Sequence, residues 1–254
     1  MSKTFAEQVV IVSGAGRGLG AAIARAFARE GAAVVVNWRK SEAEAVALAE
    51  ELGPRARAIQ ADVTDSAAVA RMVAEATETL GAPTTLVHNA LADYSFNGDG
   101  REKAETLSWE HIATQTQTSV GGALNLIQAC LPAMREAGFG RVITIGTNLF
   151  QNPVVPYHDY TAAKGALLGL TRTMSRELGP LGVTVNMISG GLLRVTDASR
   201  ATPDEVFELI AANTPLGRVT TPEELADVAL FFASSWARGV TGQNLVVDGG
   251  LVCD

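Results

Sequence analysis

The sequence predicts an α/β fold in which about seven parallel strands form one doubly wound sheet with helices on both faces. Short runs rich in valine and isoleucine alternate along the chain with longer stretches whose apolar residues recur every three or four positions. The short runs are almost continuously apolar, which is typical of strands buried on both faces of a parallel sheet.

Strands and helices are expected to alternate through right-handed crossovers, giving a Rossmann-like topology. The clearest helices are Ala21–Arg29, Ser66–Leu80 and Ala162–Leu178. Two poorly patterned segments, Leu91–Ser108 and Ser189–Leu216, follow strand ends, where folds of this type bind ligands. The predicted strands are Gln8–Ser13, Ala33–Asn37, Arg57–Gln60, Thr85–His88, Arg141–Ile145, Val183–Ile188 and Asn244–Val247.

Composition excludes several classes of protein. The chain has 254 residues, 47% hydrophobic and 19% charged, without repeats or linkers, so we expect one globular domain over residues 1–254. A net charge of -7 without a Lys/Arg run argues against nucleic-acid binding. Two cysteines and three scattered histidines argue against a disulfide framework and a metal site. No apolar run reaches the ~18 residues of a membrane span, and the N-terminus lacks a signal-peptide pattern, which predicts a cytoplasmic protein.

A glycine-rich loop, SGAGRGLG at residues 13–20, follows the first predicted strand and precedes a helix. Gly14, Gly18 and Gly20 permit a tight turn and let the backbone approach a pyrophosphate. The free N–H groups and positive dipole at the following helix N-terminus favour an anion. The loop therefore predicts a dinucleotide site, although its spacing differs from the commoner G-x-G-x-x-G.

The residues after the second strand indicate which nicotinamide cofactor binds. A carboxylate there would bind the ribose hydroxyls and repel a 2′-phosphate. This chain instead reads Asn37-Trp38-Arg39-Lys40, and Arg17 of the glycine loop adds a third cation. Charge complementarity favours NADP(H) over NAD(H). The plainer interpretation is that Arg39 and Lys40 are solvated loop residues.

Tyr160 and Lys164 stand four residues apart on a predicted helix and share one of its faces. A nearby ammonium and an oxidised nicotinamide would favour the phenolate and lower the pKa of Tyr160, so that it exchanges a proton with a carbonyl oxygen. Thr147 follows the Arg141–Ile145 strand, and its hydroxyl is suited to holding that carbonyl. Alone, each residue has a bland explanation in packing or solvation.

Together these motifs resemble the short-chain dehydrogenase/reductase (SDR) family over nearly the whole chain. The glycine loop is similar to the family's T-G-x-x-x-G-x-G, and Tyr160 with Lys164 to its Y-x-x-x-K. Asp62-Val63, Asn89-Ala90 and TGQNLVVDGG at residues 241–250 resemble its adenine-contacting, N-N-A-G and C-terminal strand motifs. The resemblance is closest to bacterial 3-oxoacyl-[acyl-carrier-protein] reductases, which share similar GRGLG and NWRKSEAEA segments.

The resemblance implies a catalytic group and a cofactor-binding group. Thr147 replaces the family's catalytic serine, and Ser119 replaces an asparagine that supports a water-mediated proton relay. With Tyr160 and Lys164 they form the expected catalytic set. The expected cofactor contacts are Gly14, Arg17, Gly18, Leu19, Gly20, Trp38, Arg39, Asp62, Val63, Asn89, Ala90, Tyr160, Lys164, Gly191 and Leu193.

Other departures lie in the loops. Leu91 replaces a glycine near the nicotinamide ribose, so we expect that loop to take another path. Gly190-Gly191 replaces a Pro-Gly pair, and the following threonine is displaced by one position to Thr196. Tyr157 either walls the substrate pocket or packs, and we favour packing.

The expected activity is NADPH-dependent reduction of a ketone, most closely a 3-oxoacyl thioester. Arg135, Arg141 and Arg172 are scattered candidates for contacting an acidic acyl carrier protein. A sugar, polyol or hydrophobic ketone is the alternative substrate, and a non-catalytic sensor or scaffold is the second alternative. The resemblance also implies a homotetramer that uses the helix at about Ser108–Ala137 and the helix after Tyr160.

Overall fold

The computed structural model describes residues 3–94, 96, 100–194, 196, 199–200 and 202–253. Seven parallel strands form one sheet in the order β3-β2-β1-β4-β5-β6-β7. The chain runs outward from β1 to β3 and then returns to place β4 beside β1, which confirms the doubly wound fold. The strands are β1 (Val9–Val12), β2 (Ala33–Trp38), β3 (Ala56–Gln60), β4 (Thr85–His88), β5 (Gly140–Thr147), β6 (Val183–Gly190) and β7 (Asn244–Val247).

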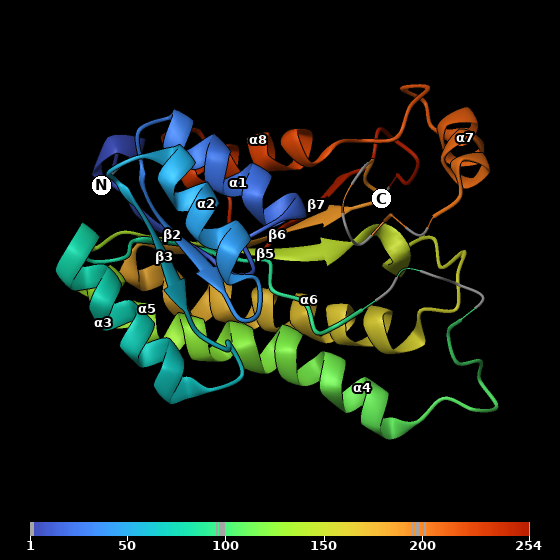
Figure 1. Cartoon of the computed structure of the whole chain (residues 1–254), viewed down its shortest axis with the longest axis horizontal. Coiled ribbons are helices and arrows are strands. Elements are labelled where there is room, and N and C mark those ends of the chain that lie inside the picture. The colour runs from blue at the N-terminus through green and yellow to red at the C-terminus, as the bar shows by residue number, and fades with distance from the viewer. Residues whose placement is uncertain are drawn as a thin grey trace.

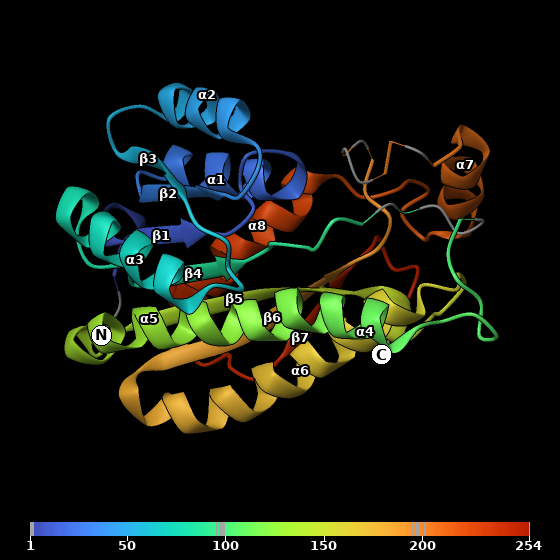
Figure 2. The same ribbon diagram turned by 60° about the horizontal axis from the view of Figure 1, so that its bottom comes forward.

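Helices cover both faces of the sheet (Figures 1 and 2). In both views α1, α2 and α8 lie on one face, while α3, α4, α5 and α6 lie on the other. α7 stands beyond the end of the sheet, beside the loops that leave the carboxyl ends of the strands. The helices are α1 (Gly18–Arg29), α2 (Glu42–Leu52), α3 (Ser66–Leu80), α4 (Trp109–Thr116), α5 (Gly122–Ala137), α6 (His158–Leu178), α7 (Asp204–Asn213) and α8 (Pro222–Ala233).

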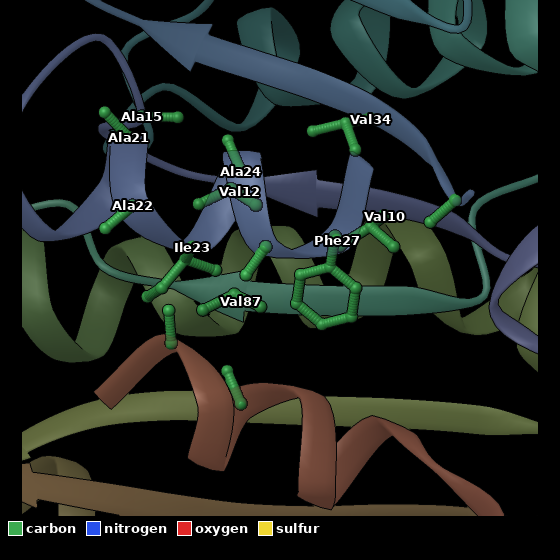
Figure 3. Packing of buried hydrophobic residues seen from close by; sticks show 14 of the residues in the cluster. Val10, Val12, Ala15, Ala21, Ala22, Ile23, Ala24, Phe27, Val34 and Val87 are labelled. Atoms are coloured by element: carbon green, nitrogen blue, oxygen red, sulfur yellow. The ribbon is translucent and has the colours of Figure 1, made fainter. Parts of the chain in front are cut away.

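Two apolar clusters hold the helical layers against the sheet. On one face, the alanines of α1 let the helix lie close to the strands, and Figure 3 shows Ile23 and Phe27 pointing toward Val87 of β4. On the other face, Leu126 and Met134 of α5 pack in the cluster that contains Leu86 of β4. Burial on both faces explains why the strand sequences are almost continuously apolar.

The structure confirms the predicted elements and moves several of their ends. β5 and β6 each run two residues beyond the predicted ends, which brings Thr147 and Gly190 into register as paired strand residues. α6 begins at His158, four residues before the predicted start, because its first turn carries polar side chains and the apolar pattern begins only at Ala162. Within the described residues, no helix is both long enough and apolar enough to cross a membrane.

The predicted long helix is present as α4 and α5 with a π-helical turn between them. The π turn spans Gln117–Gly121 and contains Ser119. Turns of this kind occur often at functional sites because they re-aim side chains within an otherwise regular helix. The change of helical register therefore falls at Ser119, which the sequence analysis placed in the expected catalytic set.

Candidate active site

The glycine loop lies between β1 and α1 and has the backbone shape that a dinucleotide site needs. Gly14 and Gly18 have φ angles of +63° and +55°, in the left-handed region that side chains disfavour. A Cβ atom on Gly20 would lie 2.3 Å from the carbonyl oxygen of Gly14. The absence of side chains at these positions keeps the N-terminus of α1 close to the loop, where its N–H groups can receive a phosphate.

Buried side chains of neighbouring strands fix this loop. The Asn37 carbonyl accepts a hydrogen bond from the Ala15 N–H at 2.8 Å, and its side-chain oxygen accepts one from the Gly14 N–H at 3.4 Å. The Asn89 amide donates to the carbonyls of Ser13 and Gly14, each at 3.1 Å. The side chain of the predicted residue Asn89 therefore holds the loop by binding the loop's backbone carbonyls, and Asn37 holds it by accepting from the loop's backbone N–H groups.

His88 and Ser13 form a buried polar link beneath the loop. The Ser13 hydroxyl accepts hydrogen bonds from the N–H groups of Asn89 and Ala90, so its own proton points to Nδ1 of His88, 3.1 Å away. Because Nδ1 accepts, Nε2 of His88 carries the single ring proton and donates to the Ser119 carbonyl at 3.0 Å. Burial, with Lys164 nearby, lowers the pKa of His88 to about 3, so the ring is neutral.

Thr147, Tyr160 and Lys164 meet at the carboxyl end of β5, as expected. All three side chains are buried, and a hydrogen bond joins Thr147 to the Tyr160 hydroxyl. Lys164 Nζ donates to the Ile145 carbonyl at 2.7 Å and lies 5.7 Å from the centre of the Tyr160 ring. The helix spacing of four residues places the phenol and the ammonium on one face, beside the strand that carries the hydroxyl.

The protein groups alone do not lower the pKa of Tyr160. Burial raises it to about 12, and the hydrogen bond with Thr147 only partly offsets this. Burial also lowers the pKa of Lys164 to about 8. Without the cofactor, Tyr160 is therefore a protonated hydrogen-bond donor at neutral pH, and the expected lowering of its pKa beside an oxidised nicotinamide stays a prediction.

Ser119 lies in the π turn, fully buried, close to this group. Its carbonyl is bound by His88, whereas its hydroxyl has no hydrogen-bond partner among the described residues. A buried unpaired hydroxyl costs free energy unless a water or ligand binds it. Ser119 therefore remains a candidate for holding a water molecule.

The cations expected near a 2′-phosphate gather at one end of the site, together with two carboxylates. Arg39 lies 3.6 Å from a carboxylate oxygen of Asp62 and 3.2 Å from one of Asp93. Lys40 Nζ lies 2.5 Å from the other oxygen of Asp93. The positive charge of Arg17 also helps to lower the pKa of Asp93. Sequence reasoning identified the three cations and Asp62 but missed Asp93.

The remaining predicted cofactor contacts line the same edge of the sheet. The Val63 side chain is buried, and its carbonyl accepts a hydrogen bond from the Asn125 amide at 2.9 Å. Leu19 packs at the margin of the apolar cluster of α1. The Trp38 indole is buried in that cluster, so its side chain serves packing.

Two further predicted contacts lie in the loop that follows β6. The position of Gly191 leaves little room for a side chain, because a Cβ there would lie 3.0 Å from the Asn148 amide. Leu193 bridges to Thr220, and its carbonyl accepts from Ser199 at 2.9 Å. Thr196 lies beside the glycine loop, since a Cβ on Gly18 would be 3.6 Å from it.

Aromatic residues cover Tyr160 on its other side. Tyr94 and Phe96, from the segment after β4, have ring centres 5.2 Å and 5.3 Å from that of Tyr160. Tyr157 packs edge-on against both Tyr94 and Phe96. Tyr157 therefore packs against the two aromatic residues that cover the candidate catalytic tyrosine.

A partly buried ion pair holds this aromatic cover in place. Arg101 lies 2.5 Å from Asp159, the neighbour of Tyr160, and stacks over the Tyr94 ring at 4.0 Å. The Tyr94 hydroxyl donates to Asp159 at 3.3 Å. Sequence reasoning missed Arg101, Tyr94 and the role of Asp159, because these contacts join segments about 60 residues apart and follow no local motif.

The histidines and arginines can now be assigned. Among the described residues, no group of histidine, cysteine or carboxylate side chains is arranged to hold a metal. Arg141 is buried and stacks on Phe139 at 4.1 Å, so its suggested contact with a carrier protein was wrong. Arg135 and Arg172 are exposed.

These features define a class of protein, an oxidoreductase that binds a nicotinamide dinucleotide. The model for the family described as enoyl-(acyl carrier protein) reductase matches residues 14–252. The chain therefore belongs to the short-chain dehydrogenase/reductase family. The glycines at the N-terminus of α1 and the cations after β2 fit NADP(H), which is the cofactor of this protein.

Relatives with different activities match nearly the full chain. The short-chain reductase protein NovJ of Streptomyces niveus is 35% identical over 253 residues, covering 96% of this chain and 94% of the relative. The 3-oxoacyl-[acyl-carrier-protein] reductase FabG of Escherichia coli is 32% identical over 250 residues, with 97% and 98% covered. A gluconate 5-dehydrogenase from Burkholderia cenocepacia, solved with NADP and tartrate, is 29% identical with a TM-score of 0.87, covering 96% and 95%.

Proposed function

We propose that this protein reduces a ketone to a secondary alcohol with NADPH, and that its substrate is a 3-oxoacyl thioester. The observation that carries the proposal is the buried group of Thr147, Tyr160 and Lys164 at the sheet edge that also carries the glycine loop. Similarity to a 3-oxoacyl-[acyl-carrier-protein] reductase over nearly the full chain supports the substrate class.

Each residue of the group has a role that its surroundings support. Bound NADPH supplies the hydride. Thr147 orients the substrate carbonyl through its hydroxyl, and Tyr160, protonated because burial raises its pKa to about 12, donates a proton to the carbonyl oxygen. Lys164, held by the Ile145 carbonyl, stabilises the phenolate that remains and binds the nicotinamide ribose.

The cover over Tyr160 favours an apolar substrate next to the reacting carbon. The half-buried rings of Tyr94 and Phe96 lie beside Tyr160 there, which suits an acyl chain or another hydrophobic ketone. Exposed Arg135 and Arg172 are the remaining candidates for contact with an acidic carrier protein. The homotetramer and the cytoplasmic location stay predictions.

A sugar or polyol substrate is the second candidate. It is supported by the similarity to a gluconate 5-dehydrogenase and by the charged pair of Arg101 and Asp159 beside the aromatic cover. A hydroxylated substrate needs hydrogen-bond partners of this kind in a binding site. A purely non-catalytic role is disfavoured because Thr147, Tyr160 and Lys164 are assembled together.

The deciding experiment follows loss of NADPH absorbance with acetoacetyl-CoA, repeated with NADH and with a keto-sugar acid. Rapid turnover of acetoacetyl-CoA that depends on Tyr160 supports the acyl reductase. Turnover of the sugar acid alone would transfer the proposal to the second candidate. Tight NADPH binding without turnover of either substrate would contradict the proposed reaction on both.

A further inference from the structure

The Asp93 carboxylate lies between the two cations that are expected to bind the 2′-phosphate of NADP(H). One oxygen is 3.2 Å from Arg39 and the other is 2.5 Å from Lys40. Asp93 comes from the segment after β4, whereas Arg39 and Lys40 follow β2, so the three residues meet through the fold. The Asp93 side chain remains 70% exposed, which leaves it open to exchange.

The charges around Asp93 identify what kind of group can replace it. Arg39, Lys40 and Arg17 all lower its pKa, with Lys40 contributing most, so it is ionised at neutral pH. The three cations face two carboxylates, Asp93 and Asp62. A 2′-phosphomonoester carries nearly two negative charges and three strong acceptor oxygens, and it therefore suits the same cations better than one carboxylate does.

We propose that Asp93 is a cofactor-specificity residue, an internal counter-ion that competes with the 2′-phosphate of NADP(H) for Arg39 and Lys40. This inference rests on the proposed preference for NADPH. NADP(H) must displace Asp93 before it engages both cations. NAD(H), which has a ribose hydroxyl instead of the phosphate, leaves the ion pairs intact. Asp93 therefore lowers the affinity for NADP(H) without lowering that for NAD(H), which reduces the ratio between the two affinities.

The sign of the effect separates this role from a supporting one. A residue that only holds Arg39 and Lys40 in position would, when neutralised, weaken binding of the phosphorylated cofactor. A competitor would strengthen it when neutralised. Since the pairs are exposed and screened by salt, we expect about a fivefold change in affinity rather than a larger one.

The test compares Asp93→Asn with the wild type by calorimetric titration of NADPH, NADH and 2′,5′-ADP. Asp227→Asn is the matched control. Asp227 is an exposed acid on α8 that lies 3.3 Å from Arg29 of α1, and its replacement changes the net charge by the same amount as Asp93→Asn does. We expect Asp93→Asn to bind NADPH and 2′,5′-ADP about fivefold more tightly at low salt, with NADH unchanged. If Asp93→Asn bound NADPH and 2′,5′-ADP, the two ligands with a 2′-phosphate, with unchanged or lower affinity, the proposal would be overturned.

A second variant tests the mechanism. In a Lys40→Gln background the gain from Asp93→Asn should shrink, because one of the two contested cations is gone. A gain of full size in that background would contradict competition for Lys40. A wild type that binds NADH more tightly than NADPH would refute the proposed preference, whereas an unmoved NADPH/NADH ratio in Asp93→Asn would refute only the present inference.

Discussion

The cofactor side and the substrate side of this site are built from different interactions. On the cofactor side, the glycine loop is held by short hydrogen bonds to backbone groups from Asn37, Ser13 and Asn89. Most of these partners lie at strand ends whose positions the sheet already fixes. Little can change there without moving the backbone.

On the substrate side, side chains hold side chains. Tyr94, Phe96 and Tyr157 pack ring on ring around Tyr160, and Arg101 pairs with Asp159 to keep Tyr94 in place. Tyr94, Phe96 and Arg101 come from the segment after β4 and Tyr157 from the loop after β5, whereas Asp159 and Tyr160 lie in the first turn of α6. Loops on a rigid scaffold tolerate substitution, and they carry the differences in specificity between related enzymes.

The difference shows which part of a site a sequence can specify. Backbone shape depends on residue types with few alternatives, such as glycine at positive φ, whereas a substrate wall can be built from many side chains. We therefore expect substitutions at the glycines of the loop to weaken cofactor binding strongly, and substitutions on the substrate side to change selectivity. Tyr160, where the two sides meet, should be the most sensitive position.

Replacing Tyr160 with phenylalanine should have the largest effect. The change removes the proton donor and keeps the ring that packs against Tyr94 and Phe96. We expect turnover of acetoacetyl-CoA to fall by about a thousandfold, in line with the loss of a general acid, while the affinity for NADPH stays within about twofold. Steady-state kinetics and calorimetric titration measure the two quantities.

Tyr157→Phe is the matched control, because Tyr157 belongs to the same aromatic wall and lies three residues away. It should retain turnover within about threefold, since the proposed reaction uses no proton from Tyr157. Equal turnover in Tyr160→Phe and the wild type would exclude Tyr160 as the acid and contradict the proposed mechanism.

Gly20→Ala should be the most damaging change on the cofactor side. The new methyl group would lie 2.3 Å from the Gly14 carbonyl oxygen and 2.9 Å from the Ala15 Cα, both of them backbone atoms. Because the loop must shift to accommodate it, we expect NADPH affinity to fall about a hundredfold. Gly169→Ala in α6 is the control, since a Cβ there has open space within 4 Å. Normal NADPH binding by Gly20→Ala would show that the loop accommodates a side chain at position 20, and would contradict the view that the loop tolerates little change.

Much of the fold and of the cofactor side could be predicted from the sequence. The seven strands and the helices follow from apolar periodicity, and the glycine spacing fixes the strand–loop–helix unit. The position of Thr147 could be predicted because it lies at the carboxyl end of a buried strand, and that of Lys164 because the helical repeat brings it to the face of Tyr160. In each case a local pattern carries the spatial information.

The remaining features depend on contacts that no local pattern encodes. Asp93 meets Arg39 and Lys40, and Arg101 meets Asp159, only after distant loops come together. The raised pKa of Tyr160 in the protein without cofactor was not foreseen for a related reason, since the sequence reveals the nearby cation but not how completely the phenol is buried. Features that depend on burial or on contacts between distant loops can be determined only from the structure.

His88 offers a test of the cofactor side through pH. Its folded pKa of about 3 lies below the ordinary 6.5, so on acidification the unfolded chain takes up a proton that the folded chain does not. Stability should therefore fall as the pH drops below 6.5, by about 2 kcal/mol at about pH 5. His88→Asn, which keeps a side-chain hydrogen-bonding group of similar size without the imidazole, should lose about that much less between about pH 7 and about pH 5 in denaturant titrations. Parallel losses in both proteins would show that His88 is not what makes the fold acid-sensitive.

Tyr94→Leu should have the smallest effect and tests the substrate side. Leucine keeps an apolar side chain beside Tyr160 but removes the ring under Arg101 and the hydroxyl that donates to Asp159 at 3.3 Å. Burial, with Asp159 nearby, raises the pKa of Tyr94 far above its ordinary value, so it does not exchange protons during the reaction. We therefore expect a KM change of about threefold for acetoacetyl-CoA with little change in kcat, and less still for Tyr94→Phe, which keeps the ring. A kcat loss approaching that of Tyr160→Phe would mean that Tyr94 takes part in the chemistry. The substrate side next to Tyr160 would then be as sensitive to substitution as the glycine loop, which would contradict the comparison of the two sides.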